Sequence, residues 1–391
     1  MHSVQKSSLR LAHLSLALSM LLTSIAVSIP NVALPLIARD FGSSVSEAQR
    51  VIVAYLFAVT FTIVVAGRLG DTLGRRKVLL IGILLYAVSA LYCVFAPTLW
   101  LLVVARGLQG LGGSIVMSLT VASTAEISST QRVGSSIGLL ATMSAVGTAA
   151  GPSLGGIIVG ATSWQCTFML MALLGMLSFY LVYRYLPAPK RNKASPPLQL
   201  TILRRGGLSS NLVMNAIVST VMMSTLIVGP FYLTDTLGLA PTTIGFIMSV
   251  GPLMSIISGI PSGRVVDRLG TKKVISIGLA VMGLGASALV ILPPLIGMVG
   301  FIVATAILSP GYQLFQAANS TSAMTAADVD QRGMVSGLLS FSRNLGLMAG
   351  ASLMGSIYAH SSMQITFLTA IVLTGIALGV AQKGKYEAKL T

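Results

Sequence analysis

Two arginines stand inside long apolar stretches of this sequence, where an ionised side chain is costly. Arg106 lies in LLVVARGLQGLGGS, about eight residues from one end of its apolar run, and Gln109 follows on nearly the same helical face. Arg343 lies about ten residues into another run and precedes Asn344. Such a charge either faces an aqueous cavity and serves substrate or coupling, or ties neighbouring helices together through their carbonyls. Both interpretations stay open for both arginines.

Carboxylates avoid these stretches. Each of the nine acidic residues maps to a predicted loop or to the end of an apolar run, and they are Asp40, Glu47, Asp71, Glu126, Asp235, Asp267, Asp328, Asp330 and Glu387. A cavity whose embedded charges are two arginines should favour neutral or anionic solutes.

Other polar side chains at membrane depth are candidates for lining the same cavity, and three of them share one helical turn near residue 312. The predicted substrate-cavity residues are Ser24, Asn31, Arg106, Gln109, Asn215, Tyr312, Gln313, Gln316, Arg343 and Asn344. The sequence contains no nucleophile with a base at fixed spacing and no phosphate-binding loop, and its three histidines are widely scattered. We therefore predict no enzymatic activity, no cofactor and no metal site.

Composition identifies a membrane protein. Hydrophobic residues make up 54% of the chain and charged residues only 9%, with a mean hydropathy of +0.88. Apolar runs of roughly 20 residues must be helices in a bilayer, because every backbone polar group there needs an internal partner. The predicted fold is all-α, with twelve transmembrane spans at 11–37, 47–66, 78–95, 99–125, 133–160, 163–186, 210–235, 242–262, 274–293, 298–322, 334–357 and 363–381.

The two halves of the chain are copies of one unit. The segment GRLGDTLGRRKVLL at 67–80, which we predict to be a charged turn, returns 196 residues later as GRVVDRLGTKKVIS at 263–276. When residues 67–83 are aligned with residues 263–279, nine of the seventeen positions are identical. We predict two six-helix bundles, residues 1–186 and 208–391, joined by a cytoplasmic linker at 187–207 that is rich in proline and basic residues.

The net charge of +16 follows from topology. If the N-terminus is cytoplasmic, 21 of the 25 lysines and arginines fall on the inner side, as the positive-inside rule requires. This placement explains the basic balance without nucleic acid as a partner. It predicts a multi-pass protein with both termini cytoplasmic, and the lack of large soluble insertions favours a bacterial inner membrane.

Several of these segments resemble signatures of the major facilitator superfamily. The segment at 67–80 resembles the signature between helices two and three, Arg106 with Gln109 resembles the helix-four motif, and GTAAGPSLGG at 147–156 resembles the helix-five antiporter motif of the drug efflux branches. The small residues and the proline of this last motif favour a hinge at Gly147, Gly151, Pro152, Gly155 and Gly156, with ordinary tight packing as the alternative. The resemblance implies a cytoplasmic latch, whose residues are Gly67, Asp71, Gly74, Arg75, Glu126 and Asp267. The alternative is that these charges only set topology.

In that family, Asp71 and Arg75 would pair with Glu126 and with the start of span 11. We further expect Asp71 to lie near a helix N-terminus, where the helix dipole favours a carboxylate.

The resemblance predicts a secondary active transporter that exports drug-like or amphipathic organic solutes by alternating access, with proton antiport, as a monomer in the lipid bilayer. One departure weakens proton coupling: Ala26 occupies the place where proton-coupled drug antiporters commonly have an acid. Two alternatives stay open. One is a metabolite or sugar exporter, uniporter or anion exchanger without proton coupling, and the other is a sensor or scaffold that has kept the fold without transport.

Overall fold

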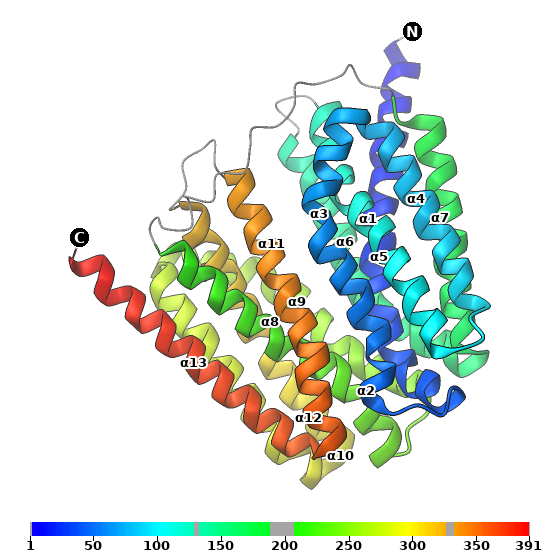
Figure 1. Ribbon diagram of the computed structural model, residues 1–391. Coiled ribbons are helices and arrows are strands. Elements are labelled where there is room, and N and C mark those ends of the chain that lie inside the picture. Colours follow the sequence, from blue (N-terminus) through cyan, green and yellow to red (C-terminus); the bar gives the residue numbers. More distant parts are fainter. Residues whose placement is uncertain (1, 129–132, 188–206, 326–331, 391) are drawn as a thin grey trace. The chain divides into compact units, whose positions relative to one another are not determined.

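The computed structural model describes residues 2–128, 133–187, 207–325 and 332–390, and these residues form helices joined by short turns, with no strand among them (Figure 1). The first half contains α1 (His2–Asp40), α2 (Val45–Ala48), α3 (Arg50–Leu73), α4 (Arg75–Val94), α5 (Leu99–Ile127), α6 (Val133–Ala161) and α7 (Trp164–Tyr185). The second half contains α8 (Leu208–Phe231), η2 (Tyr232–Thr236), α9 (Pro241–Leu269), α10 (Thr271–Thr325), α11 (Arg332–Ala349), η4 (Gly350–Met354), α12 (Gly355–His360) and α13 (Met363–Leu390).

Each of the twelve predicted spans corresponds to helical structure. Within the described ranges, nine helices are long and apolar enough to cross a membrane, or ten if the bent pair Val45–Ile63 and Val65–Leu73 is one span. Helix α10 is 55 residues long and contains two predicted spans. It breaks at Ile296 and Gly297, where Gly297 has a φ of +57°, and the close approach of Gly285 to Leu308 shows that its two arms pack as a hairpin.

Helix α11 is not among the helices that are apolar enough to cross a membrane, although it covers most of the predicted span 334–357. The reason is a polar side of the helix that includes Ser336, Ser340 and Arg343. The span continues through the π-helix η4 into α12.

The predicted charged turn is much shorter than expected. Helix α3 continues to Leu73 and α4 begins at Arg75, so the turn is Gly74 alone, with a φ of +97°. The other glycines of this segment serve packing, because added Cβ atoms on Gly67 and Gly70 would meet Ser118 and Leu119 of α5.

The expectation that Asp71 lies near a helix N-terminus was wrong. Asp71 belongs to the last turn of α3, where the dipole of its own helix does not favour a carboxylate.

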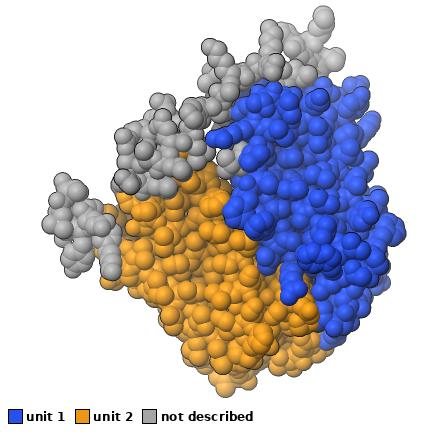
Figure 2. Space-filling view, in the orientation of Figure 1, with its two compact units in different colours: residues 1–43, 50–196 blue, residues 44–49, 197–391 orange. Residues whose placement is uncertain are grey.

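The chain divides into two compact units, residues 1–43 with 50–196 and residues 44–49 with 197–391 (Figure 2). The division falls within the range 187–207 that we predicted to be a linker, and residues 188–206 lie outside the described part of the chain.

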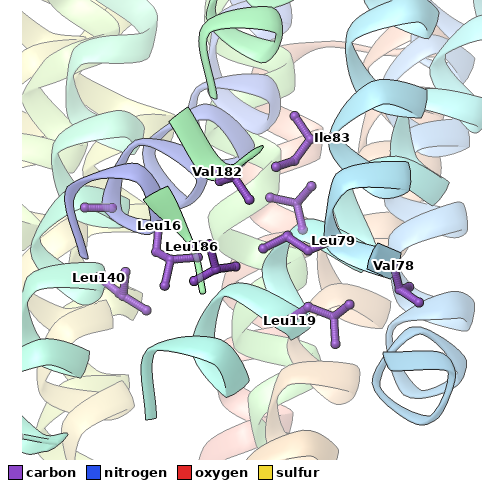
Figure 3. Packing of buried hydrophobic residues seen from close by; sticks show 10 residues of the cluster. Leu16, Val78, Leu79, Ile83, Leu119, Leu140, Val182 and Leu186 are labelled. Atoms are coloured by element: carbon purple, nitrogen blue, oxygen red, sulfur yellow. The ribbon is translucent and has the colours of Figure 1, made fainter. Parts of the chain in front are cut away.

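The core of the first unit lies where five helices converge. Ten buried residues from α1, α4, α5, α6 and α7 form one hydrophobic cluster, which includes Leu16, Leu79, Leu119, Leu140 and Val182 (Figure 3). In a bilayer such a cluster stabilises the helix contacts through close van der Waals packing, because lipid tails are as apolar as the side chains themselves. The second unit has a smaller cluster of buried residues on α8, α10 and α11, made of Leu208, Ala323, Val335 and Leu339.

Glycines set the helix spacing in both units. In the first unit, Gly147, Gly151 and Gly155 of α6 face α1, and the Ser28 hydroxyl donates to the Gly147 carbonyl across that contact (3.2 Å). In the second unit, Gly346 of α11 faces the backbone of Ala216 on α8, and the Thr220 hydroxyl donates to the Gly346 carbonyl (3.0 Å). The two halves therefore use the same kind of contact between equivalent helices.

A single methyl group at the crossing of α4 and α5 tests this packing. A Cβ on Gly112 would lie 2.6 Å from the Tyr86 nitrogen and 2.7 Å from the Gly82 carbonyl oxygen, both of them backbone atoms. We expect Gly112→Ala to destabilise the protein by about 1–3 kcal/mol through overpacking. The matched control is Gly107→Ala in the same helix, where a Cβ would meet no atom within 4 Å.

The measurement is the temperature of thermal unfolding in detergent. The readout is chemical labelling of the Cys93 thiol, which is buried in the folded protein, and the variants carry Cys166→Ser because Cys166 is exposed. Equal unfolding temperatures for the two variants would contradict close backbone packing at this crossing.

Candidate functional site

Arg106 lies inside the first unit with no exposed surface. Its guanidinium donates to the Val51 carbonyl (Nε, 3.3 Å), to Oε1 of Gln109 (Nη1, 2.6 Å) and to the Ala26 carbonyl (Nη2, 3.2 Å). The group therefore links α5 to α3 and α1 through neutral oxygens. No carboxylate of the described residues forms an ion pair with it.

Two aromatic rings complete the surroundings of Arg106. Its guanidinium carbon lies 4.3 Å from the centre of the Tyr55 ring and 5.8 Å from that of Phe168. Such cation–π contacts stabilise a desolvated guanidinium by about 2 kcal/mol or more. Nothing in the sequence singles out Tyr55 as a partner of Arg106, because an aromatic residue in an apolar span gives no signal of this contact until α3 and α5 are packed together.

The other predicted cavity residues of the first unit are also buried. Ser24 shares a hydrogen bond with Ser144 of α6 (2.8 Å between the hydroxyl oxygens). Asn31 donates to the Val27 carbonyl (2.9 Å), and its Oδ1 has no hydrogen-bond partner among the described residues. That these residues line a substrate cavity stays a prediction.

The second unit holds the remaining candidates, and they do not share one environment. Asn215 is buried and donates to the Leu339 carbonyl of α11 (2.8 Å). Gln316 donates to the Tyr312 hydroxyl (3.1 Å), as expected for residues on one turn of a helix. Gln313 instead donates to the Ser255 carbonyl of α9 (3.0 Å), and that the three residues line one cavity stays a prediction.

Arg343 differs from Arg106 in its exposure and in its hydrogen bonding. It is partly exposed, its Nε has no hydrogen-bond partner, and it forms no ion pair within the described part of the chain. Asn344, its neighbour, is 5% exposed.

Three of the predicted latch residues, Asp71, Arg75 and Glu126, meet where α3 and α5 end and α4 begins. Arg75 donates through Nη2 to Oδ1 of Asp71 (2.9 Å) and through Nη1 to Oε2 of Glu126 (3.3 Å). Side-chain exposures of 22% for Arg75, 10% for Asp71 and 17% for Glu126 mean that solvent only partly screens the cluster. The pairing with the start of span 11 stays a prediction.

The second copy of this segment lacks the cation at the centre of the cluster. Thr271 stands where the first copy has Arg75, and Asp267 is exposed and makes no ion pair with the described residues. Among the described residues, a charge cluster of this kind is therefore found in the first copy of the segment and not in the second.

The predicted hinge residues lie in an uninterrupted helix. Pro152 falls inside α6, which runs from Val133 to Ala161, and Gly147, Gly151 and Gly155 are in contact with α1. In the second half Ala351 replaces the proline, and there the helix changes to the π-helix η4. Bending at α6 stays a prediction.

Among the described residues, no group of three or more histidine, cysteine, aspartate or glutamate side chains is placed to hold a metal ion.

Two repeated all-helical units with apolar helices of membrane length define a multi-pass membrane carrier of small solutes, which is not an enzyme. The family model described as Major Facilitator Superfamily matches residues 16–212 and 211–383, so the chain belongs to this superfamily.

The names of related proteins refer to different transported solutes. The chain is 23% identical to the riboflavin transporter RibZ of Clostridioides difficile (85% of each chain covered). It is 25% identical to the multidrug resistance protein Stp of Mycobacterium tuberculosis (85% of this chain and 72% of that protein).

Among solved structures, it resembles a bacterial homologue of the human lysosomal transporter Spinster in an inward-facing, unoccupied conformation. The TM-score is 0.80 at 14% identity, with 96% of this chain and 97% of that chain covered, which supports the fold alone.

The contrast between the two arginines gives a stability prediction. We expect Arg106→Lys to lower the free energy of unfolding by about 2–4 kcal/mol, because an ammonium group loses the planar stacking on Tyr55 and leaves buried carbonyl oxygens without donors. Arg343→Lys serves as the control, because the Nε of Arg343 has no hydrogen-bond partner and its guanidinium forms no ion pair with the described residues. Thermal unfolding in detergent measures both variants, and equal losses of stability would contradict the structural role of Arg106.

The charge cluster gives a transport prediction. We expect Asp71→Asn to leave membrane insertion intact and to lower the transport rate severalfold, because Arg75 loses its shortest ion pair. The rate is measured at equal membrane abundance, with Asp267→Asn in the second copy as the matched control. Wild-type rates in Asp71→Asn would mean that these charges only set topology.

Proposed function

We propose that this protein is a secondary active exporter of drug-like or amphipathic organic solutes that works by alternating access and proton antiport. The observation that carries the proposal is the three-residue charge cluster of Asp71, Arg75 and Glu126 at the joined ends of three helices. A partly shielded cluster of this kind stabilises one conformation by about 1 kcal/mol, which thermal motion can overcome in every cycle.

In this mechanism the two halves rock about a solute held near the middle of the membrane, as in other transporters built from repeats. The cluster stabilises one end of the cycle. The glycine contacts on α6 and α11 allow their helices to slide, because no side chain stands between the backbones. The protein would act as a monomer in a cytoplasmic membrane with both termini inside the cell.

Export of drug-like solutes is supported by the similarity to Stp, whose name identifies it as a multidrug resistance protein, and by the GTAAGPSLGG motif at 147–156. With no ATP-binding motif in the sequence, a gradient is the expected source of energy. Protons would be carried by acids at the span ends. Glu126 is the first candidate, because it pairs with Arg75 in the cluster.

The alternative is a metabolite or sugar exporter, uniporter or anion exchanger without proton coupling. Two observations favour it: all nine acidic residues of the sequence map outside the middle of the predicted spans, and one relative is named as a riboflavin transporter.

Proteoliposomes loaded with a pH-sensitive dye separate the two functions. Cationic, neutral and anionic solutes are added in turn, with protein-free liposomes as the control and a protonophore to confirm that the dye responds. We expect solute addition to change the internal pH, since antiport exchanges protons for solute. Solute uptake without a pH change would replace antiport with the alternative, and the absence of solute counterflow would contradict transport.

A further inference from the structure

The two intramembrane arginines differ in how many of their hydrogen-bond donors are already used by the described residues. Three of the hydrogen bonds of Arg106 are made to protein oxygens, and aromatic rings lie near its faces. Arg343 donates to no described residue, and its Nε is buried without a partner. A guanidinium that is always charged and has no protein partner needs one from outside the described protein.

The position of Arg343 on α11 defines what it faces. At 100° per residue, Ser336, Ser340 and Arg343 fall within about 60° of one another, and all three are at least partly exposed. We call these three residues the polar stripe. Leu347 continues the same side of the helix one turn beyond Arg343, so an apolar surface lies next to the charge.

The remaining surface of α11 has different tasks. Gly346 and Leu339 pack toward α8, which fixes the rotation of the helix about its axis. Leu345, on another side, is 37% exposed and suits lipid. A polar stripe with a charge at membrane depth does not face lipid, so it faces a water-filled path.

The chain supplies no carboxylate near this guanidinium along the sequence. The nearest acid before it in the sequence, Asp330, is thirteen residues away. A guanidinium matches the two oxygens of a carboxylate or sulfonate through paired N–H donors, and the Nε of Arg343 is an unused donor that the protein encloses. The hydroxyl of Ser340, one turn away on the same side, offers a further donor.

We propose that Arg343 and the polar stripe bind the anionic group of the transported solute, so that this carrier prefers amphipathic organic anions, such as carboxylates or sulfonates with an apolar body. The proposal rests on the proposed export function and specifies its substrate class. Arg106, by contrast, has a structural role in the first unit.

Binding to the purified full-length protein tests the proposal with a pair of probes that differ only in charge. Dansylphenylalanine carries a carboxylate, its methyl ester is neutral, and the dansyl fluorescence reports binding of both. For the wild-type protein we expect the carboxylate to bind about tenfold more tightly or better, as for a desolvated bidentate pair.

The variants assign that preference to one side chain. Arg343→Gln should bring the ratio of the two affinities to about one and leave ester binding within about twofold, and Arg343→Lys should fall between, because it keeps the charge and loses the paired N–H donors. Leu345→Ala, on a different side of the same helix, should keep the wild-type ratio.

An unchanged ratio in Arg343→Gln, or equal binding of acid and ester by the wild-type protein, would overturn the proposal. If Arg343→Gln does not fold, the wild-type ratio and Arg343→Lys decide. Counterflow of neutral or cationic solutes without carboxylate binding would leave the export function standing and remove this inference. Carboxylate binding without any counterflow would remove the export function and keep the site.

Discussion

A polar group inside a bilayer must find its partner within the protein or in an aqueous path, because lipid offers none. Most of the first unit follows from this constraint. The guanidinium of Arg106 is satisfied by two backbone carbonyls, one side-chain amide and an aromatic ring, which together hold α1 and α3 against α5. The same constraint draws attention to Arg343, whose Nε has no hydrogen-bond partner among the described residues.

Close helix contact is the second requirement, and glycine provides it. The hydroxyls of Ser28 and Thr220 donate to glycine carbonyls on neighbouring helices, a contact that a bulkier residue at the glycine would separate. Both halves keep this device, although Pro152 of the first half has become Ala351 within a π-helix in the second. The repeat has thus preserved packing while its local helix geometry has diverged.

Charge has diverged further than packing. The first half places Arg75 between two carboxylates, whereas Thr271 in the second half leaves Asp267 exposed without an ion pair among the described residues. In the membrane-embedded part, the first half encloses its arginine and the second half presents one on the polar stripe. We propose accordingly that conformational bias lies in the first half and solute recognition in the second.

The sequence by itself determined the membrane class, the twelve spans and the duplication, because a span in lipid must be apolar, helical and of a length set by the bilayer. It also identified Asp71, Arg75 and Glu126 as candidate charged partners, through the resemblance to the family signature. It misjudged the turn at 67–80, since Gly67 and Gly70 look like turn residues until α5 is packed against them.

Only the tertiary structure shows that the two arginines have different surroundings. Arg106 and Arg343 both lie in predicted spans, and the residues near them in sequence left both roles open for each. The difference comes from residues far away in sequence, such as Ala26, Val51 and Tyr55 around Arg106, and the described residues offer no such partners to Arg343. Satisfaction of a buried charge is a property of the packed helices, so it becomes visible only after folding.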